Sequence, residues 1–258
     1  MKIALVGYGK MGHIIERIAV EKGHDIVATI DSFANDASHK IANSTELADA
    51  IKSSKPEAII EFTHPDSVME NIKTLLPLGV PLVVGTTGWN DKFAEVEKMA
   101  KDAGTALFYA SNFSIGVNMF YKIVEEASKL MAQYDDYDVA TWEAHHTQKA
   151  DSPSGTAIDI AKAVMRGNSS KTEMVIDAFH EKPQKHQLHV SSTRVGNVPG
   201  THTVFFDSMA DTIELTHKAR NREGFALGSV TAAKWLAEGV ANGALTGGSL
   251  YTMSDMLA

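Results

Sequence analysis

Short apolar runs alternate with amphipathic segments through roughly the first half of the chain. Runs such as KIALV at 2–6 and DIVATID at 25–31 are too short for helices and end at glycine or aspartate. Strands that alternate with helices imply crossover connections. The pattern therefore predicts an α/β unit with a doubly wound parallel sheet, whose other strands are EAIIEF (57–62), PLVVGTT (81–87) and ALFYAS (106–111) and whose helices are 11–23, 68–79 and 93–104.

The alternation of short apolar runs and amphipathic segments ends near Phe113. Helices are predicted at 117–131 and 156–165, on either side of an extended run, YDVATWEAHH at 137–146. Four more extended segments then follow with short turns and no spacer of helix length. We expect a second, α+β unit with a mixed, largely antiparallel sheet; the segments are MVIDAFH (174–180), HVSSTRVG (189–196), HTVFFDSM (202–209) and DTIELTHKA (211–219), and a last helix is predicted at 228–240.

Composition narrows the class of protein. The 258 residues are 44% hydrophobic, which is enough for a buried core, and the formal net charge of −8 argues against nucleic acid or an anionic membrane as partner. The absence of cysteine rules out disulfides and cysteine metal sites. Glycines interrupt the first apolar run before it reaches signal-peptide length, and no apolar stretch approaches ~20 residues. We expect a cytoplasmic protein.

The glycine-rich turn GYGKMG at 7–12 fits a dinucleotide-binding pattern because of its context. It follows a predicted strand and precedes a predicted helix, and Asp31 ends the next strand near the expected ~20-residue spacing. Gly7 and Gly9 would let the backbone turn under a pyrophosphate, and Gly12 would let helix and strand pack closely. Asp31 would accept hydrogen bonds from the ribose hydroxyls. A tight turn without a ligand is the weaker alternative.

Charge at this turn bears on the choice of cofactor. A carboxylate at Asp31 repels a 2′-phosphate, and neither Ser32 nor Phe33 is an arginine that would offset it. We therefore expect NADH to be preferred. Lys10 offers a positive charge in the same loop, so use of NADPH stays open.

Two more strand ends, EFTHP at 61–65 and VVGTTG at 83–88, place small and hydroxyl-bearing residues at the carboxyl edge of the predicted sheet. Ligands bind at this edge in open α/β sheets. We expect the GTTG segment to lie against the nicotinamide ribose. A third end, YASNFS at 109–114, is where we place the crossing between the two units.

The segment EAHHTQKADSPSGTA at 143–157 concentrates polar and titratable residues. Strand alternation places Val139, Thr141, Glu143 and His145 on one face, so adjacent His145 and His146 cannot chelate one metal on a regular strand. Ser154 fits a helix N-cap followed by free amides, an anion site to which Lys149 adds charge. We expect a pocket for a small carboxylate whose reaction needs a proton. A capped helix beside a basic loop is the alternative.

The string E-x-H-H-x-x-K-x-D-x-P-S-G-T-A, in a chain that starts with a glycine-rich turn, resembles dihydrodipicolinate reductases of bacterial and plant lysine synthesis. The likeness runs nearly end to end, through EFT, GTTG, ASNFSIGVN and ELTHKA. The departures are a glycine turn one residue shorter than usual, Glu61 where aspartate is common and Ser152 where alanine is common. The first of these departures touches the cofactor site.

The resemblance implies a mechanism and a set of site residues. Hydride passes from NADH or NADPH to C4 of a cyclic unsaturated imine, the ring is protonated, and His145 and Lys149 are the acid/base residues. The dicarboxylate substrate is implied to bind Gly155, Thr156 and His146, and we add Arg194 by weaker inference. The implied cofactor contacts, beyond the glycine turn and Asp31, are Tyr8, Lys10, Met11, Gly85, Thr86, Thr87, Ala110, Ser111, Asn112 and Phe113. No metal is implied.

The same resemblance suggests a homotetramer, and the predicted architecture divides the chain into three parts. Residues 1–113 would bind the dinucleotide, 114–224 would bind substrate and form the oligomer, and a C-terminal helix within 225–258 would return to the first part. Two other functions stay open. One is another Rossmann dehydrogenase of a small carboxylate, and the other is a dinucleotide sensor without catalysis; transfer of labelled hydride separates them.

Overall fold

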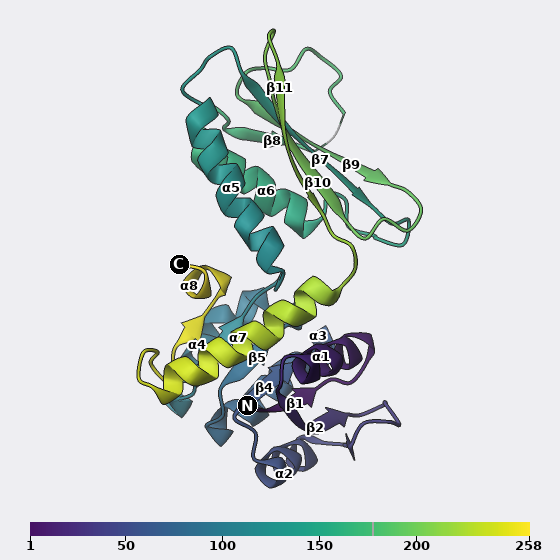
Figure 1. Ribbon diagram of the computed structural model, residues 1–258, viewed down its shortest axis with the longest axis vertical. Helices are drawn as coiled ribbons and strands as arrows, with labels where there is room; N and C mark the ends of the chain where they lie inside the picture. The colour runs from purple at the N-terminus through teal and green to yellow at the C-terminus, as the bar shows by residue number, and fades with distance from the viewer. Residues whose placement is uncertain (177) are drawn as a thin grey trace. The chain divides into compact units, whose positions relative to one another are not determined.

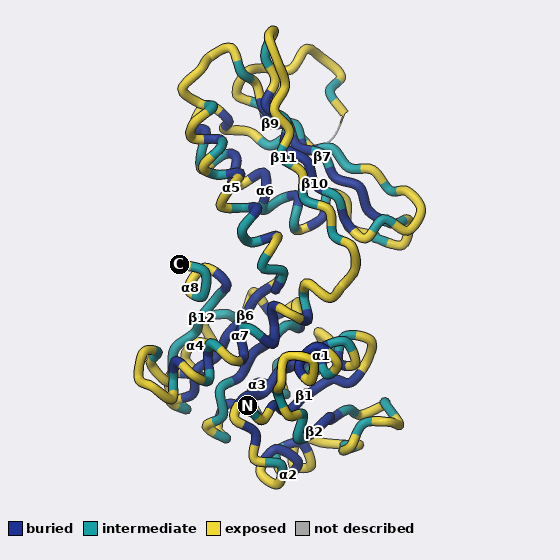
Figure 2. Tube along the Cα trace, viewed as in Figure 1, coloured by how far each residue is buried: buried dark blue, intermediate teal, exposed yellow. Residues whose placement is uncertain are grey.

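The computed structural model describes residues 1–176 and 178–258, which form two compact units (Figure 1). The first comprises Met1–Ile115 and Glu223–Ala258, and the second comprises Gly116–Arg222. Each unit has its own sheet, and buried segments run through the strands of both (Figure 2). Among the described residues, no helix combines the length and apolar character needed to cross a membrane.

The first unit is built on a parallel sheet. Over the described residues it has seven strands in the order β12-β6-β5-β4-β1-β2-β3. The order reverses at β1, as in doubly wound dinucleotide-binding folds, so the predicted fold class is confirmed. The strands are β1 (Lys2–Val6), β2 (Asp25–Asp31), β3 (His39–Lys40), β4 (Ala58–Glu61), β5 (Leu82–Val84), β6 (Leu107–Tyr109) and β12 (Leu250–Tyr251).

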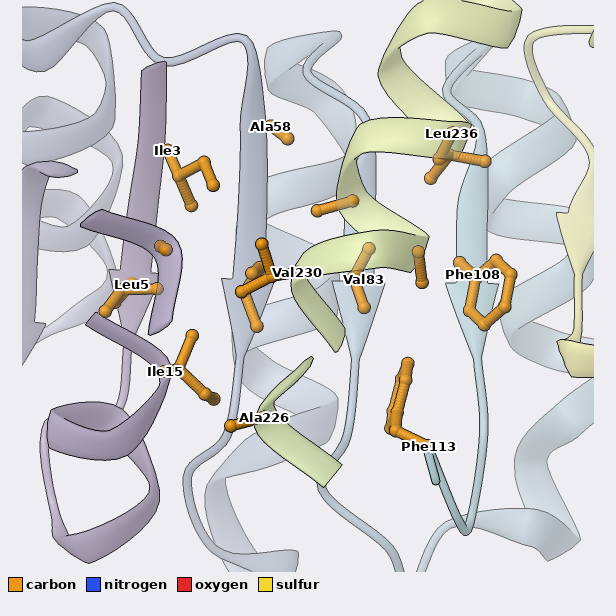
Figure 3. Close-up of a cluster of buried hydrophobic side chains, with 14 of the residues drawn as sticks. Ile3, Leu5, Ile15, Ala58, Val83, Phe108, Phe113, Ala226, Val230 and Leu236 are labelled. Atoms are coloured by element: carbon orange, nitrogen blue, oxygen red, sulfur yellow. The ribbon is translucent and has the colours of Figure 1, made fainter. Parts of the chain in front are cut away.

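Helices cover both faces of this sheet, which is why its strands are apolar on both sides. On one face, Ile3 and Leu5 of β1 pack with α1 and α7 in a single buried cluster (Figure 3). On the other face, Ala4 and Val6 pack with α2, α3 and α4. The helices are α1 (Lys10–Glu21), α2 (Ser44–Ser54), α3 (Pro65–Leu75), α4 (Phe93–Ala103), α7 (Glu223–Ala241) and α8 (Met253–Met256), with short 3₁₀ turns at Leu76–Leu78 and Asn90–Lys92.

Helix α7 begins five residues before the predicted start at Gly228, which lies inside the helix. Close packing explains why a glycine is found there. A β-carbon at Gly228 would lie 1.7 Å from the carbonyl oxygen of Phe113, so a larger residue would force the helix away from the chain beneath it. This helix lies in the first unit, although the whole second unit precedes it in sequence.

Helix α2 lies in a stretch that the sequence pattern leaves as polar. Its apolar stripe is short, consisting of Leu47, Ala50 and Ile51. The overlooked signal is its N-terminus, where the Asn43 side chain accepts a hydrogen bond from the amide of Glu46 and Glu46 bonds back to the amide of Ala42. An asparagine followed three residues later by glutamate is typical of a helix start.

The second unit has a mixed sheet, as predicted. Within the described residues its five strands run in the order β11-β10-β7-β9-β8. Antiparallel pairing joins β10 to β11 and to β7, whereas β9 runs parallel to β7 and to β8. The strands are β7 (Asp138–His145), β8 (Glu173–Val175), β9 (Gln187–Arg194), β10 (Thr201–Asp207) and β11 (Thr212–Lys218).

The strands of this sheet do not follow their order in the sequence, because β9 inserts between β7 and β8. Helix α6 (Gly155–Gly167) supplies one crossover connection, and this connection makes parallel pairing possible. The expected strand 174–180 is observed only as far as Val175, where its pairing with His189 of β9 ends. Asp177 of that predicted strand lies outside the described residues.

Helices α5 (Ile115–Met131) and α6 pack on one face of this sheet. Their residues Phe120, Val124 and Ile160 share a buried cluster with Val190 and Val204 of the strands. Along β7, Val139, Thr141, Glu143 and His145 are buried, as the predicted alternation requires. The buried face therefore changes from apolar to polar toward the end of β7.

Candidate active site

The glycine-rich turn between β1 and α1 is packed tightly on one side and open on the other. Gly7 has a φ of +96°, and a β-carbon there would lie 2.1 Å from the carbonyl oxygen of Phe62. A β-carbon at Gly12 would lie 2.5 Å from the carbonyl oxygen of Gly7. Gly9, the N-cap of α1, has no atom within 4 Å of such a carbon. The turn thus leaves open space at the start of α1, where phosphates bind in other folds of this type.

Asp31 ends β2 beside this turn. Its Oδ2 accepts a hydrogen bond from the amide of Tyr8 at 2.7 Å, and its Oδ1 accepts from the amides of Phe33 and Ala34 at 2.7 and 2.9 Å. Burial acts to raise the pKa of Asp31, but the hydrogen bonds from Tyr8, Ala34, Phe33 and Ser32 together outweigh burial and leave the pKa below its usual value. The carboxylate is therefore charged at neutral pH.

A cavity of about 240 Å³ opens beside Asp31 and lies within the first unit. Two of the residues that we expected to contact the cofactor, Gly9 and Asp31, line it. Its lining combines apolar side chains with a few polar groups, as is typical of small-molecule sites. The other lining residues are Val6, Ile30, Ser32, Phe33, Ile41, Phe62, Thr63, His64, Ser67 and Asn71.

The loops after β4, β5 and β6 meet around Phe62. A β-carbon at Gly85 would lie 2.0 Å from the Phe62 ring, and the Thr86 hydroxyl accepts a hydrogen bond from the amide of Thr63 at 2.7 Å. The Phe113 ring packs on Phe62 with 5.8 Å between centroids. Phe113 is 2% exposed, so a contact with the cofactor there would come from its backbone.

The remaining expected cofactor residues divide by exposure. Tyr8 and Ala110 are buried, and the Tyr8 ring stacks on His13 at 4.1 Å while its hydroxyl bonds Glu16. Tyr8 therefore offers its backbone, not its ring. Lys10, Thr87 and Ser111 are exposed, whereas Met11 and Asn112 are half-buried.

Glu61 is a buried carboxylic acid that no sequence motif marked as a site residue. It ends β4, is 0% exposed, and its Oε1 accepts hydrogen bonds from the hydroxyl of Thr63 and from Asn71 Nδ2, the latter at 3.1 Å. Burial raises the pKa of this carboxyl group above its usual value, although hydrogen bonds oppose the shift. The group anchors the loop that carries Thr63 to the sheet.

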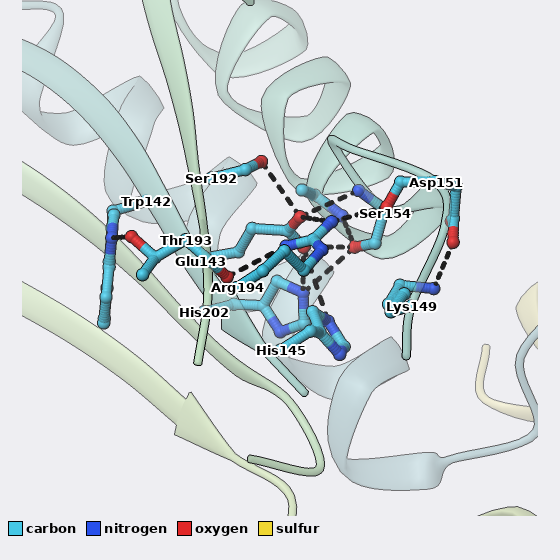
Figure 4. A network of polar contacts seen from close by, with 11 residues as sticks. Trp142, Glu143, His145, Lys149, Asp151, Ser154, Ser192, Thr193, Arg194 and His202 are labelled. Carbon is cyan, nitrogen blue, oxygen red and sulfur yellow. Dashed lines mark hydrogen bonds and ion pairs between the residues drawn. The ribbon is translucent and has the colours of Figure 1, made fainter. Parts of the chain in front are cut away.

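In the second unit, the residues of the 143–157 segment gather where β7 ends at His145 (Figure 4). The rings of His145 and His146 are 6.4 Å apart and inclined at 83°, so the two do not face a common point as a chelating pair. Lys149 follows in a turn, where its amide donates to the carbonyl oxygen of His146 at 3.1 Å. Its Nζ lies 2.8 Å from Oδ1 of Asp151.

Helix α6 presents its N-terminus to this site. Ser154 is its N-cap and accepts a hydrogen bond from the amide of Ala157 at 3.1 Å, as predicted. Gly155 is exposed, with no atom within 4 Å of an added β-carbon, and Thr156 is half-buried. The first turn of α6 is therefore accessible to an anion.

Arg194, at the end of β9, is held by three acceptors. Its Nη2 donates to Glu143 Oε1 at 3.0 Å and to the carbonyl oxygen of Asp151 at 2.5 Å, and its Nη1 donates to the carbonyl oxygen of Thr193 at 3.0 Å. The arginine thus links β9, β7 and the loop before α6. The structure brings Arg194 into the same cluster as His145 and Ser154.

His202 also belongs to this cluster, although no sequence motif marked it as a site residue. It lies on β10, directly opposite Glu143 of β7, with its Nε2 3.3 Å from Glu143 Oε2. Glu143, His145 and His202 each offer one ligand atom within 4.8 Å of the others, which are donors that zinc accepts. Arg194 already balances the Glu143 charge, which disfavours a dication. Because the contact depends on antiparallel pairing, spacing along the chain gave no signal for it.

The charges in this cluster shift two pKa values. Burial acts to raise the pKa of Glu143, but hydrogen bonds from His202, Ser154 and Arg194 together hold it far below its usual value. Burial lowers the pKa of His145 to about 4, helped by the nearby positive charges of His202, Lys149 and Arg194 and opposed by Glu143. His145 is therefore neutral at pH 7 without an anionic ligand.

Comparison with known proteins decides the family. Residues 1–113 match the family described as "Dihydrodipicolinate reductase, N-terminus", and residues 116–257 match "Dihydrodipicolinate reductase, C-terminus". The chain belongs to the dihydrodipicolinate reductase family. The resemblance inferred from the 143–157 segment is thus confirmed.

Relatives of this family match over the whole chain. A 4-hydroxy-tetrahydrodipicolinate reductase of Christiangramia forsetii is 39% identical over 258 residues, which cover 100% of this chain and 98% of that protein. The enzyme of the same name from Archaeoglobus fulgidus is 36% identical, with 100% of both chains covered. Dipicolinate-bound dihydrodipicolinate reductase from Paenisporosarcina sp. TG-14 has the same fold, with a TM-score of 0.74 at 22% identity, over 100% of this chain and 99% of that one.

Proposed function

We propose that the protein reduces 4-hydroxy-tetrahydrodipicolinate to tetrahydrodipicolinate in diaminopimelate and lysine synthesis, using a reduced pyridine nucleotide. The observation that carries this proposal is membership of the reductase family along the whole chain. The cluster in the second unit supports it, because His145, Lys149, Arg194 and the start of α6 lie together there. A sensor without catalysis would not need this cluster.

In the proposed reaction, the substrate loses its 4-hydroxyl as water, and C4 of the resulting unsaturated ring would receive hydride from the bound dinucleotide while the ring takes up a proton. Gly7, Gly9 and Asp31, with the loops at 85–87 and 110–113, would hold it in the first unit, and the open space at Gly9 suits a phosphate there. In the second unit, the α6 N-terminus at Gly155 and Thr156, with Arg194 and His146, would hold the substrate carboxylates.

Lys149 is the proposed proton donor. Its ammonium group is paired with Asp151 and its side chain is 24% exposed, so it lies at the edge of the cluster. Neutral His145 would accept and return a proton, since its low pKa leaves a ring nitrogen unprotonated at pH 7. A substrate carboxylate nearby would raise that pKa, because an opposite charge favours the protonated imidazole.

We infer a preference for NADH over NADPH. The charged carboxylate of Asp31 lies beside the cavity, where it would accept hydrogen bonds from ribose hydroxyls and repel a 2′-phosphate. Lys40 of β3 lies opposite Asp31 in the strand register, and the positive charges of Lys40 and Lys10 would also allow use of NADPH. The preference is measured as the ratio of kcat/KM for the two cofactors, and a value for NADPH equal to or above that for NADH contradicts it.

We also propose a homotetramer in the cytoplasm. Over the described residues, α5 and α6 cover one face of the second unit's sheet, and the other face presents Trp142 and Phe205, both half-buried in the single chain. A second copy on that face would cover them. Light scattering after gel filtration measures the mass, and a monomer at micromolar concentration contradicts the proposal. The cytoplasmic location stays a prediction.

The decisive experiment generates the unstable substrate in situ with the preceding synthase and follows the absorbance of NADH or NADPH. We expect turnover by the wild type and a loss of at least hundredfold in Lys149→Ala, with cofactor affinity unchanged. Lys162→Ala removes an exposed lysine of α6 that pairs with Asp159, and is the matched control. Tight cofactor binding without oxidation by the wild type would contradict the proposal and favour a sensor.

A further inference from the structure

Glu143 is the centre of the polar cluster in the second unit (Figure 4). It is 0% exposed, yet its two oxygens accept hydrogen bonds from several elements. Oε1 accepts from the Ser154 amide at 2.9 Å, the Ser192 hydroxyl at 3.0 Å and Arg194 Nη2 at 3.0 Å. Oε2 accepts from the Ser154 hydroxyl. A single carboxylate therefore ties β7 to β9 and to the N-terminus of α6.

The sheet register explains how this arrangement arises. Glu143 of β7 pairs with Ser192 of β9 on one side and with His202 of β10 on the other. The three side chains therefore lie in a row on the face that carries α6. His202 Nε2 is 3.3 Å from Glu143 Oε2 and 3.4 Å from the Ser154 hydroxyl, so it contacts both residues from the β10 side.

We propose that Glu143, with His202 behind it, is a positioning residue that fixes Ser154, Arg194 and His145 relative to one another for substrate binding. A buried carboxylate whose donors come from three elements resists displacement, because each broken bond leaves a buried polar group unpaired. The α6 N-terminus and Arg194 are the groups proposed to bind the substrate carboxylates. This inference rests on the proposed function, because it concerns binding of the substrate named there.

The contact with His145 is electrostatic. His145 Nε2 lies 3.4 Å from Glu143 Oε2 and, among the described residues, has no hydrogen-bond partner. The negative charge of Glu143 raises the pKa of His145, whereas the positive charge of His202 lowers it. Glu143 and His202 therefore shift the pKa of His145 in opposite directions. A residue that only stabilised the fold would not shift this pKa in a defined direction.

The experiment compares Glu143→Gln, His202→Gln and the wild type. The substitution Glu143→Gln keeps the side-chain length but replaces one acceptor oxygen with a donor, which cannot accept from Ser154 or Arg194. The probe is dipicolinate, a planar dicarboxylate that the Paenisporosarcina reductase binds. We expect its Kd to rise at least tenfold in Glu143→Gln, and kcat to fall with it, while NADH affinity stays the same.

A second measurement follows His145 by NMR in protein labelled with ¹⁵N-histidine, with His145→Gln to assign its signals. We expect Glu143→Gln to lower the pKa of His145 and His202→Gln to raise it. If Glu143→Gln does not fold, as judged by its melting temperature and NADH affinity, the titration of His145 in His202→Gln still tests the inference. No change of the His145 titration in the variants that fold would overturn the inference.

The matched control is Glu125→Gln. Glu125 also pairs with an arginine, since Arg166 Nε lies 2.8 Å from its Oε2, but its side chain is 27% exposed and it lies on α5. We expect the control to bind dipicolinate like the wild type. Dipicolinate affinity in Glu143→Gln within threefold of the wild type contradicts the inference. Failure of the wild type to reduce the proposed substrate contradicts the proposed function alone, because the His145 titration needs no turnover.

Discussion

A β-carbon at Gly200 would lie 2.8 Å from Cε1 of the His145 imidazole ring. Gly200 is buried in the loop before β10 and has a φ of +155°, a conformation that other residues rarely adopt. We expect Gly200→Ala to displace the ring and to lower kcat/KM by roughly tenfold to a hundredfold. Steady-state kinetics measure this effect, and NADH affinity should not change because Gly200 lies in the second unit.

The control for backbone strain is Gly196→Ala. Gly196 has a φ of +50° but no atom within 4 Å of an added β-carbon, so the substitution strains the backbone without touching His145. We expect a stability loss of about 1 kcal/mol and near-normal kinetics. Equal kinetic losses in both variants would show that contact with His145 is not the cause.

Alanine substitutions of the first two glycines of the dinucleotide turn should affect different properties of the protein. A β-carbon at Gly7 meets the Phe62 carbonyl oxygen at 2.1 Å, so Gly7→Ala should destabilise the first unit by about 2 kcal/mol or more. Gly9 has open space, so Gly9→Ala should melt like the wild type but bind NADH at least tenfold more weakly if a pyrophosphate lies there. Calorimetric melting and fluorescence titration separate the two effects. Unchanged NADH affinity in Gly9→Ala would place the pyrophosphate elsewhere.

Ser154 should matter for both stability and substrate binding. Loss of a helix N-cap costs about 1 kcal/mol, and Ser154→Ala also removes the hydroxyl that donates to Glu143. Asn43→Ala removes the N-cap of α2 in the first unit and is the matched control. We expect both variants to melt at lower temperature but only Ser154→Ala to raise KM for the substrate. An unchanged KM in Ser154→Ala would contradict a role for the α6 N-terminus in binding.

Glu61 gives a pH dependence of stability with a defined sign. Burial raises its pKa in the folded protein above the unfolded value of 4.5. Above pH 4.5 the unfolded chain loses this proton first, so the folded state binds more protons and its stability falls as pH rises. Glu61→Gln removes that dependence, and its stability relative to the wild type should increase from about pH 5 to about pH 8. Urea midpoints at both values measure this, and a constant difference would contradict the raised pKa.

The local pattern of the sequence predicted much of the fold. Strand and helix periods along the first half gave the doubly wound sheet, and the glycine turn with Asp31 marked the side of the sheet where the cavity lies. Alternation along β7 placed Glu143 and His145 on one buried face. These features depend on neighbours in sequence, so a period of about two or about 3.6 residues is enough to reveal them.

Features that depend on distant pairing came only from the tertiary structure. His202 reaches Glu143 because β10 pairs antiparallel with β7 in one register, and Ser192 reaches it because β9 inserts beside β7 instead of forming a hairpin. The shift of the His145 pKa likewise depends on burial and on charges from separate strands and loops. A strand's own residues show which side chains share a face, but the neighbouring strand and its register are decided by packing of the whole unit.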